Sequence, residues 1–234
     1  MKWNNRDNET LICADGLSIA YGRKHVLDHA DFNVPIGVTG LIGANGSGKS
    51  SLMQVLATIR RHQSGSVFIN GADISNSQGR MQARASLGYL PQVFDVMRGA
   101  TVVDNVAYAA WAHGIPDTAI VSLTQRILRD VDLIDLSNVK ARKLSGGQRQ
   151  RLGFACAVVH KPKVILLDEP TIALDESQRK RMHRLIVELG RGSAVLMSSH
   201  LLEEMKSFVG GVITLSNGCL YSDGNSATDG VIKT

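Results

Sequence analysis

The sequence predicts an α/β fold built on a mainly parallel β-sheet. Apolar strand-like runs alternate with helix-like segments along most of the 234 residues, as they do in proteins whose parallel strands are joined by crossover helices. Two of the runs, residues 164–167 and 194–197, are continuously apolar, which central strands covered on both faces require. A glycine-rich loop at residues 43–50 lies between a strand-like run and a helix-like run.

Each expected strand is a short run of apolar or β-branched residues bounded by turn residues. The runs cover residues 17–21, 32–34, 38–42, 66–69, 87–90, 164–167, 194–198 and 212–215. The early runs are short and are separated by turn pairs such as Asn70-Gly71, which favour antiparallel pairing. We therefore expect an antiparallel β patch beside the main parallel sheet.

The expected helices gather in the middle of the chain, where strand signals vanish. Residues 101–113 and 117–131 each begin at a capping residue, Thr101 and Asp117. Shorter helical runs cover residues 52–57 and 152–159, and another helix ends near Gly190. We expect one domain over residues 1–234, with a helical subdomain of approximately residues 93–160 inserted in its core. The polar first ten residues and the tail from Ser222 are expected to be weakly ordered.

Composition excludes several classes of protein. With 44% hydrophobic residues the chain can bury a core, and no apolar run approaches the ~18–20 residues that span a bilayer. Cys13, Cys156 and Cys219 lack metal-ligand spacing, which suggests reduced thiols in the cytosol. A net charge of +5 is compatible with nucleic acid or an anionic membrane surface. The basic residues are dispersed, however, so a solvated face is favoured and no nucleic-acid partner is expected.

The loop at residues 43–50 fits the phosphate-binding pattern G-x-x-x-x-G-K-[ST] at every position. Glycines let the backbone turn tightly enough to surround phosphates with N–H donors, and the helix that follows points its positive end at them. Lys49 is predicted to contact the β and γ phosphates, and the Ser50 hydroxyl to hold Mg²⁺. The expected nucleotide contacts here are Gly43, Ala44, Asn45, Gly46, Ser47, Gly48, Lys49, Ser50 and the neighbouring Ser51.

A second segment, Leu144-Ser145-Gly146-Gly147-Gln148, repeats this logic before another helical run. Its two glycines leave N–H groups accessible at a helix start, where an anion is favoured. A nucleotide has only one γ-phosphate, and the chain already carries one phosphate cradle. We therefore expect two copies to pair about a two-fold axis, with each nucleotide between one copy's loop and the other copy's second segment.

On these two motifs, the chain resembles the nucleotide-binding subunits of ATP-binding cassette (ABC) transporters over essentially its whole length. The resemblance implies a RecA-like P-loop core with an antiparallel patch and an inserted helical subdomain. It also implies that Asp168, at the end of the apolar strand 164–167, holds Mg²⁺, and that the adjacent Glu169 polarises the attacking water. A strand followed by a capped turn is the alternative for these two acids when taken alone.

The same resemblance assigns four further residues. Gln92 matches the family's glutamine that contacts Mg²⁺ and the water, and His200 matches a histidine that contacts the γ-phosphate. Asp175 matches a residue of the loop that crosses the dimer interface, with helix capping as its alternative role. Tyr21 matches an aromatic residue that stacks on adenine, with a core-facing ring as the alternative. Departures are small: Ile172 replaces a common small residue, and Ser51 a frequent threonine.

The resemblance implies an ATPase that uses ATP and Mg²⁺ to power a separate transmembrane permease, at the inner face of the cell membrane and in the cytoplasm. Residues 89–94, with Thr101-Val102 and Gly114-Ile115, are similar to the branch that exports drugs, antibiotics and lantibiotics. Import, and lipoprotein-release or cell-division machines, are the alternatives within transport. A soluble ABC ATPase of the iron–sulfur assembly type also stays open. A non-hydrolysing module is disfavoured because Lys49, Asp168, Glu169 and His200 are all present.

Overall fold

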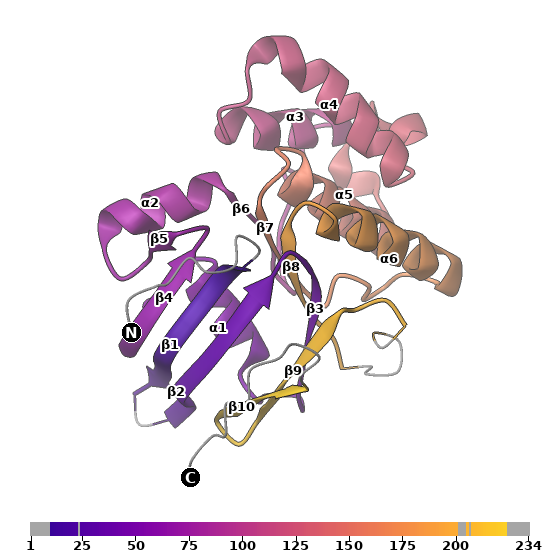
Figure 1. Ribbon diagram of the computed structural model, residues 1–234. Coiled ribbons are helices and arrows are strands. Elements are labelled where there is room, and N and C mark those ends of the chain that lie inside the picture. Colours follow the sequence, from indigo (N-terminus) through magenta and orange to yellow (C-terminus); the bar gives the residue numbers. More distant parts are fainter. Residues whose placement is uncertain (1–9, 23, 201–204, 206, 224–234) are drawn as a thin grey trace.

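The computed structural model describes residues 10–22, 24–200, 205 and 207–223, and it has an α/β architecture with two β-sheets (Figure 1). The strands are β1 (Thr10–Tyr21), β2 (Lys24–Pro35), β3 (Gly37–Ile42), β4 (Ser64–Ile69), β5 (Ala72–Asp73), β6 (Leu87–Leu90), β7 (Val164–Asp168), β8 (Ala194–Ser198), β9 (Gly211–Ser216) and β10 (Cys219–Asp223). The helices are α1 (Lys49–Leu56), α2 (Ser77–Ala85), α3 (Val102–Ala112), α4 (Asp117–Asp130), α5 (Gly146–Val158) and α6 (Glu176–Gly190), with 3₁₀ turns η1 (Ile134–Leu136) and η2 (Ala141–Lys143).

The main sheet has six strands in the order β10-β9-β3-β8-β7-β6. All neighbouring pairs are parallel except β9 with β10, so the predicted mainly parallel sheet is confirmed. Alternate residues of its central strands face opposite sides: Val164 and Leu166 pack into one hydrophobic cluster, and Ile165 and Leu167 into the other. Burial on both faces explains why these strands are continuously apolar.

The smaller sheet has the order β2-β1-β4-β5 and is antiparallel throughout, which confirms the expected patch. Its first two strands are longer than predicted, because β1 begins at Thr10 rather than at residue 17 and β2 covers residues 24–35 rather than 32–34. The pairing continues through register shifts near Gly16, whose N–H donates to Asp31 Oδ1 at 2.6 Å. Such bulges interrupt the apolar alternation on which the prediction relied.

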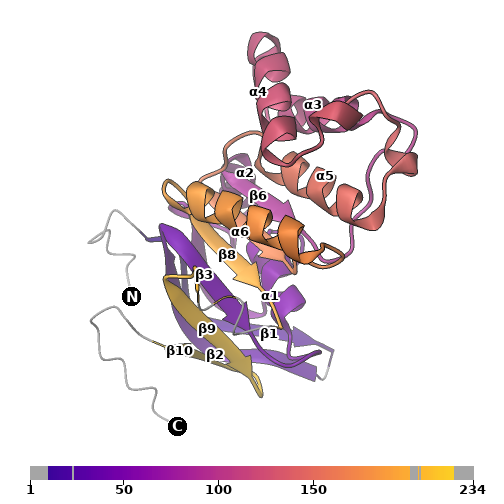
Figure 2. The ribbon, with the colours of Figure 1, turned by 90° about the vertical axis from the view of Figure 1, so that its right-hand side faces the viewer.

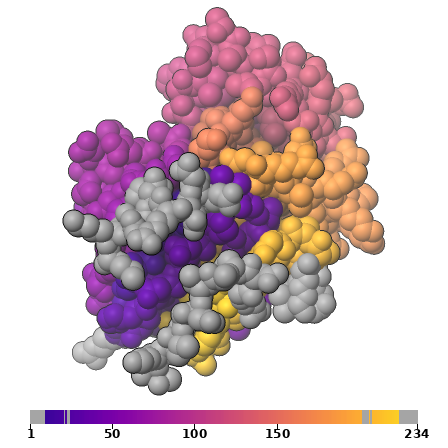
Figure 3. Space-filling view, viewed as in Figure 1, coloured from indigo at the N-terminus to yellow at the C-terminus, as the bar shows by residue number. Residues whose placement is uncertain are grey.

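A separate group of helices stands above the sheets, coloured pink in Figures 1 and 3 and seen from the side in Figure 2. It contains α3 and α4, the 3₁₀ turns and the start of α5, which leads back to β7. α3 begins at the predicted cap, where Thr101 and Asp104 form a reciprocal capping box. α5 begins at Gly146, six residues before the predicted run, because Ser145 caps it.

Apart from the two 3₁₀ turns, three elements were not predicted. α2 buries only Gly79 and Ala83, so it has no apolar stripe, although Asn76 caps it. β5 is two residues long and lies after the Asn70-Gly71 turn. β10 follows a turn at Asn217-Gly218, whose φ angles of 50° and 79° suit a tight hairpin. β10 reaches Asp223, one residue past Ser222, whereas nearly all the ends expected to be weakly ordered lie outside the described residues.

Candidate nucleotide-binding site

The phosphate loop, residues 43–50, runs from the end of β3 into α1, as the sequence predicts. Gly46 and Gly48 have φ angles of 77° and 112°, which side-chain-bearing residues rarely adopt. A Cβ atom on Gly48 would also overlap Val26 Cγ1. α1 begins without a side-chain cap and without an acidic residue in its first turn. Its first N–H groups therefore stay accessible to an anion.

Lys49 is buried within this loop. Its Nζ donates to Gly43 O at 2.7 Å and to Ala44 O at 3.1 Å, so the ammonium group is positioned by the loop's own carbonyls. The buried Ser47 Oγ has no hydrogen-bond partner among the described residues. A buried hydroxyl in a loop of this shape fits a bound phosphate, which would supply the missing partner. Ser50 and Ser51 are half-buried in the first turn of α1.

Asp168 and Glu169 lie where β7 ends. Asp168 is 2% exposed, and its Oδ1 accepts a hydrogen bond from Ser198 Oγ at 2.6 Å. The same Ser198 Oγ accepts from the Glu169 backbone N–H at 2.9 Å. Glu169 precedes Pro170 and has a φ of 52°, a conformation that costs a non-glycine residue of order 1–3 kcal/mol. One serine of β8 therefore fixes both acids.

Three predicted catalytic residues meet at this edge of the sheet. Glu169 Oε2 lies 3.4 Å from Gln92 Nε2 and 3.8 Å from His200 Nδ1. The three residues follow β6, β7 and β8, whose carboxyl ends lie side by side because the strands are parallel. The Glu169 side chain is 13% exposed and that of His200 is 54% exposed. A carboxylate held in this way is able to accept a proton from water.

The predicted Mg²⁺ ligands Ser50, Asp168 and Gln92 offer a hydroxyl, a carboxylate and an amide oxygen. Hard oxygen donors of this kind suit Mg²⁺, which takes its remaining ligands from nucleotide phosphates and water. The part of the chain that the structure describes has no group of three His, Cys, Asp or Glu residues able to hold a metal ion by itself. The donor set therefore fits a Mg²⁺ that arrives with the nucleotide.

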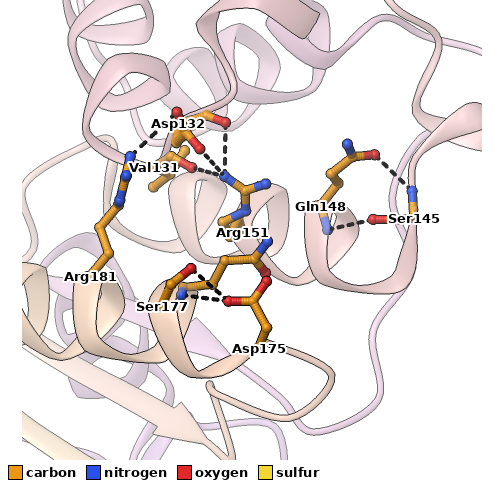
Figure 4. A network of polar contacts seen from close by, with 9 residues as sticks. Val131, Asp132, Ser145, Gln148, Arg151, Asp175, Ser177 and Arg181 are labelled. Atoms are coloured by element: carbon orange, nitrogen blue, oxygen red, sulfur yellow. Dashed lines mark hydrogen bonds and ion pairs between the residues drawn. The ribbon is translucent and has the colours of Figure 1, made fainter.

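In the signature segment, residues 144–148, the polar side chains form hydrogen bonds within the segment itself. Ser145 Oγ accepts from the Gln148 N–H at 3.2 Å, and Gln148 Oε1 accepts from the Ser145 N–H at 2.9 Å (Figure 4). This capping box engages both polar side chains, while the N–H groups of Gly146 and Gly147 have no acceptor within the helix. Among the described residues, no hydrogen bond joins this segment to residues 43–51 of the same chain.

Two further predicted contacts have different outcomes. Asp175 caps α6, accepting from the Gln178 N–H at 2.9 Å and from Ser177 Oγ at 2.8 Å. These bonds, first the one from Gln178, hold the pKa of the Asp175 carboxyl below its ordinary value. Asp175 thus has the capping role that the sequence offered as its alternative. Tyr21 is the last residue of β1, and its side chain lies outside what the structure describes.

Three residues near the predicted acids were not predicted. Ser198 stands in the run Ser198-Ser199-His200, where a polar residue ending a buried strand was a usable signal. Gln150 Nε2 donates to Pro170 O at 3.1 Å and so ties α5 to the segment after Glu169. Tyr89 of β6 buries a hydroxyl that has no partner among the described residues. Burial, with a smaller contribution from the Asp168 charge, raises the pKa of Tyr89.

Comparison with known proteins identifies the family of this chain. The family model described as "ABC transporter" matches residues 27–172, more than half of the chain. The methionine import ATP-binding protein MetN of Carboxydothermus hydrogenoformans is 31% identical over 222 residues, which cover 92% of this chain and 66% of MetN. The probable multidrug ABC transporter ATP-binding protein YbhF of Escherichia coli is 35% identical over 201 residues, which cover 84% of this chain and 34% of YbhF. The chain thus spans just under two thirds of the one relative and about a third of the other.

Solved structures show the same fold. An ATP-binding subunit of an ABC transporter superposes with a TM-score of 0.83 at 24% identity, over 91% of this chain and 90% of that one. The ATP-binding cassette MJ0796, as a post-hydrolysis dimer with ADP and Pi, superposes with a TM-score of 0.82 at 22% identity, over 91% and 98%. The chain belongs to the ABC transporter family, and its fold is that of the family's ATP-binding cassettes.

Proposed function

We propose that this chain binds ATP with Mg²⁺, hydrolyses it, and uses the energy to power transport through a separate membrane-spanning permease. The observation that carries this proposal is the convergence of Glu169, Gln92 and His200 near the buried Asp168, at the edge of the sheet that also carries the phosphate loop. Within the described part of the chain, no helix is long and apolar enough to cross a membrane.

Each residue has a defined part in this proposal. The phosphate-loop N–H groups and Lys49 bind the β and γ phosphates, and Lys49 exchanges its carbonyl contacts for phosphate oxygens. Ser50, Asp168 and Gln92 hold Mg²⁺, which when bound neutralises charge on the phosphates. Glu169 orients and polarises the attacking water, because its carboxylate lies at the edge of the sheet that also carries the phosphate loop. His200, next to Glu169, contacts the γ-phosphate.

We further propose that two copies pair, and that the signature segment of each completes the site of the other. The accessible Gly146 and Gly147 N–H groups lie at a helix start that makes no hydrogen bond to its own chain's phosphate loop among the described residues. A solved cassette of the same fold is itself described as dimeric. Residues Tyr21, Ser145, Gln148 and Asp175 then lie at or near the shared nucleotide.

The direction of transport has two candidates. Export of a drug or peptide antibiotic is supported by residues 89–94 and by the similarity to YbhF, a probable multidrug transporter protein. Import is supported by the similarity to MetN, a methionine import protein. In both cases the chain acts in the cytoplasm, on the inner face of the membrane. The iron–sulfur assembly alternative has no support among these relatives.

Purification from membranes in mild detergent tests the proposal. We expect the chain to co-purify with a multi-span membrane protein and to release phosphate from ATP only when Mg²⁺ is present. ATP-driven movement of solute in vesicles of known orientation then decides between export and import. A chain that binds no ATP, or that hydrolyses it equally well without divalent cations, would contradict the proposal.

A further inference from the structure

The Asp132 carboxylate forms ion pairs with two arginine side chains that come from two different helices (Figure 4). Arg151 of α5 donates through Nη1 to Val131 O and Asp132 O, both at 2.8 Å, and to Asp132 Oδ2 at 3.1 Å. Arg181 of α6 pairs with the other carboxylate oxygen, Asp132 Oδ1, at 3.3 Å. Asp132 and its two arginines therefore link α5 and α6 at the end of α4.

The end of α4 explains why cations gather here. α4 ends at Asp130, and the chain reverses at Asp132, whose φ is 58°. Carbonyls at a helix C-terminus carry partial negative charge and favour cations. The Arg151 side chain is only 8% exposed, so its charge must be paired. The Asp132 and Arg181 side chains are 59% and 51% exposed, and their ion pair contributes little to folding.

The two linked helices each begin at a segment of the proposed dimer face. α5 begins after Ser145, six residues before Arg151, and α6 begins after Asp175, six residues before Arg181. Those two helix starts also touch: a Cβ on Gly147 would lie 3.0 Å from Ala173 O and 3.1 Å from Gln178 Oε1. Six helical residues rise about 9 Å. Contact at the starts and a second link about 9 Å further on together fix the angle between the helices.

We infer that Asp132 is a positioning residue. It acts through Arg151 and Arg181 to fix the orientation of the signature segment relative to the start of α6 at Asp175. It touches neither nucleotide nor metal in this role. The arrangement is what the opposing copy's nucleotide would meet, so the inference rests on the proposed shared site. Arg151 is also close enough to Asp175 for its charge to contribute, after the hydrogen bonds from Gln178 and Ser177, to lowering the pKa of that carboxyl.

The test uses Arg181→Gln and Asp132→Asn, two changes that remove the exposed ion pair, the second without changing side-chain size. The Asp132→Asn side chain retains an oxygen to which Arg151 is able to donate. The matched control is Lys180→Gln, which breaks the exposed Lys180–Glu176 ion pair on the same helix. Arg181→Lys serves as the conservative rescue. The measurements are the melting temperature, ATP affinity, the rate of hydrolysis at saturating ATP, and ATP-dependent dimerisation in a Glu169→Gln background.

For Arg181→Gln and for Asp132→Asn, we expect the hydrolysis rate to fall about three- to five-fold and dimer affinity to weaken, because misplaced groups lose transition-state contacts. ATP affinity at the chain's own phosphate loop and the melting temperature should stay unchanged. The double variant should lose no more of the hydrolysis rate than either single variant. Lys180→Gln should behave as the wild type, and Arg181→Lys should recover part of the rate.

Unchanged rate and dimer affinity in both variants would overturn the inference, and so would a rate loss explained by a lower melting temperature. The proposed function fails in a different way. If the wild-type chain hydrolyses no ATP, or its Glu169→Gln variant stays monomeric with ATP, then the shared site itself is wrong and the inference falls with it.

Discussion

The phosphate loop and the signature segment both place glycine-rich backbone at a helix start, but they are built differently. In the first half of the site, which contains the phosphate loop, side chains that follow β6, β7 and β8 meet at one edge of the sheet. Ser198 forms hydrogen bonds with both acids of this half. The signature half is one capped helix start, whose position depends on α4 and α6. Under the proposed function, this difference means that the first half binds nucleotide by itself, whereas the second half is presented to the nucleotide of the partner chain.

The largest effect that separates the two halves is expected from Lys49→Ala. Lys49 is the phosphate loop's own cation, so its loss should greatly weaken ATP binding and abolish turnover. Lys143→Ala, next to the signature segment, is the matched control, because Lys143 is exposed and should leave ATP binding intact. Equilibrium binding of ATP and steady-state phosphate release measure both. Wild-type turnover in Lys49→Ala would refute the assignment of this loop.

Glu169→Gln separates binding from chemistry within the first half. The amide keeps the shape of the carboxylate but accepts no proton, so hydrolysis should slow by roughly 10²–10⁴-fold while ATP still binds. The variant should elute as a dimer with ATP and as a monomer without it. Glu188→Gln, at an exposed acid near the far end of α6, should change neither property. A Glu169→Gln variant that turns over at the wild-type rate places the water-activating group elsewhere.

A glycine from each half tests how far each backbone is constrained by its own chain. Gly48→Ala should destabilise the protein by about 2–4 kcal/mol, because the residue has a positive φ and its Cβ would meet Val26. A Cβ on Gly146 would find only Ala173 Cβ, at 3.8 Å. Gly146→Ala should therefore leave the free energy of unfolding within about 1 kcal/mol of wild type.

Hydrolysis by Gly146→Ala gives the sharper result. If the partner's nucleotide approaches this helix start, the added methyl group should slow hydrolysis although the single chain has room for it. Chemical denaturation and steady-state ATPase measurements compare the two glycines directly. Full activity in Gly146→Ala would show that no ligand approaches this position closely.

The smallest expected effect concerns the residues that follow α5, the helix that begins in the signature segment. His160 follows α5, its ring stacks on His113 at 3.5 Å between centroids, and its Nε2 lies 3.3 Å from Leu87 O. Burial, followed by the His113 charge, lowers the pKa of His160 from 6.5 to about 4. The neutral ring is therefore the form that the folded protein favours.

Because the pKa of His160 is lower in the folded protein than in the unfolded chain, lowering the pH destabilises the fold. The stabilisation by the neutral ring is complete above pH 6.5 and is lost as the pH falls toward 4. Because part of the ring contacts solvent, we expect a loss of about 1–2 kcal/mol in the free energy of unfolding. His160→Gln should flatten the dependence between these pH values, whereas His25→Gln, at an exposed position, should not. An unaltered pH profile in His160→Gln would contradict the burial of a neutral ring.

Sequence motifs predicted the residues whose chemistry is local. The phosphate loop and the parallel strands could be inferred because spacing and apolar runs predict them, whereas the two acids at the end of β7 were assigned by the family resemblance. Gln150 and Asp132 could not, because their roles depend on contacts between segments 19–20 residues apart. Ser198 carried a signal as a polar residue that ends a buried strand, but its bond to Asp168 joins positions 30 residues apart. α2 was missed for a related reason: its cap is local, but its surface is polar and only tertiary contacts place it.

The most direct test of the shared site is a mixed pair that joins one Ser145→Arg chain with one Lys49→Ala chain, isolated with two different affinity tags. Each variant alone should form inactive pairs, the first because bulk and charge at the helix start block closure, the second because ATP is not held. In the mixed pair, both defects fall in one composite site and neither falls in the other. We predict that phosphate release returns to about half of the wild-type rate if the two sites act independently. No recovery in confirmed heterodimers would contradict a site shared between two chains that act independently.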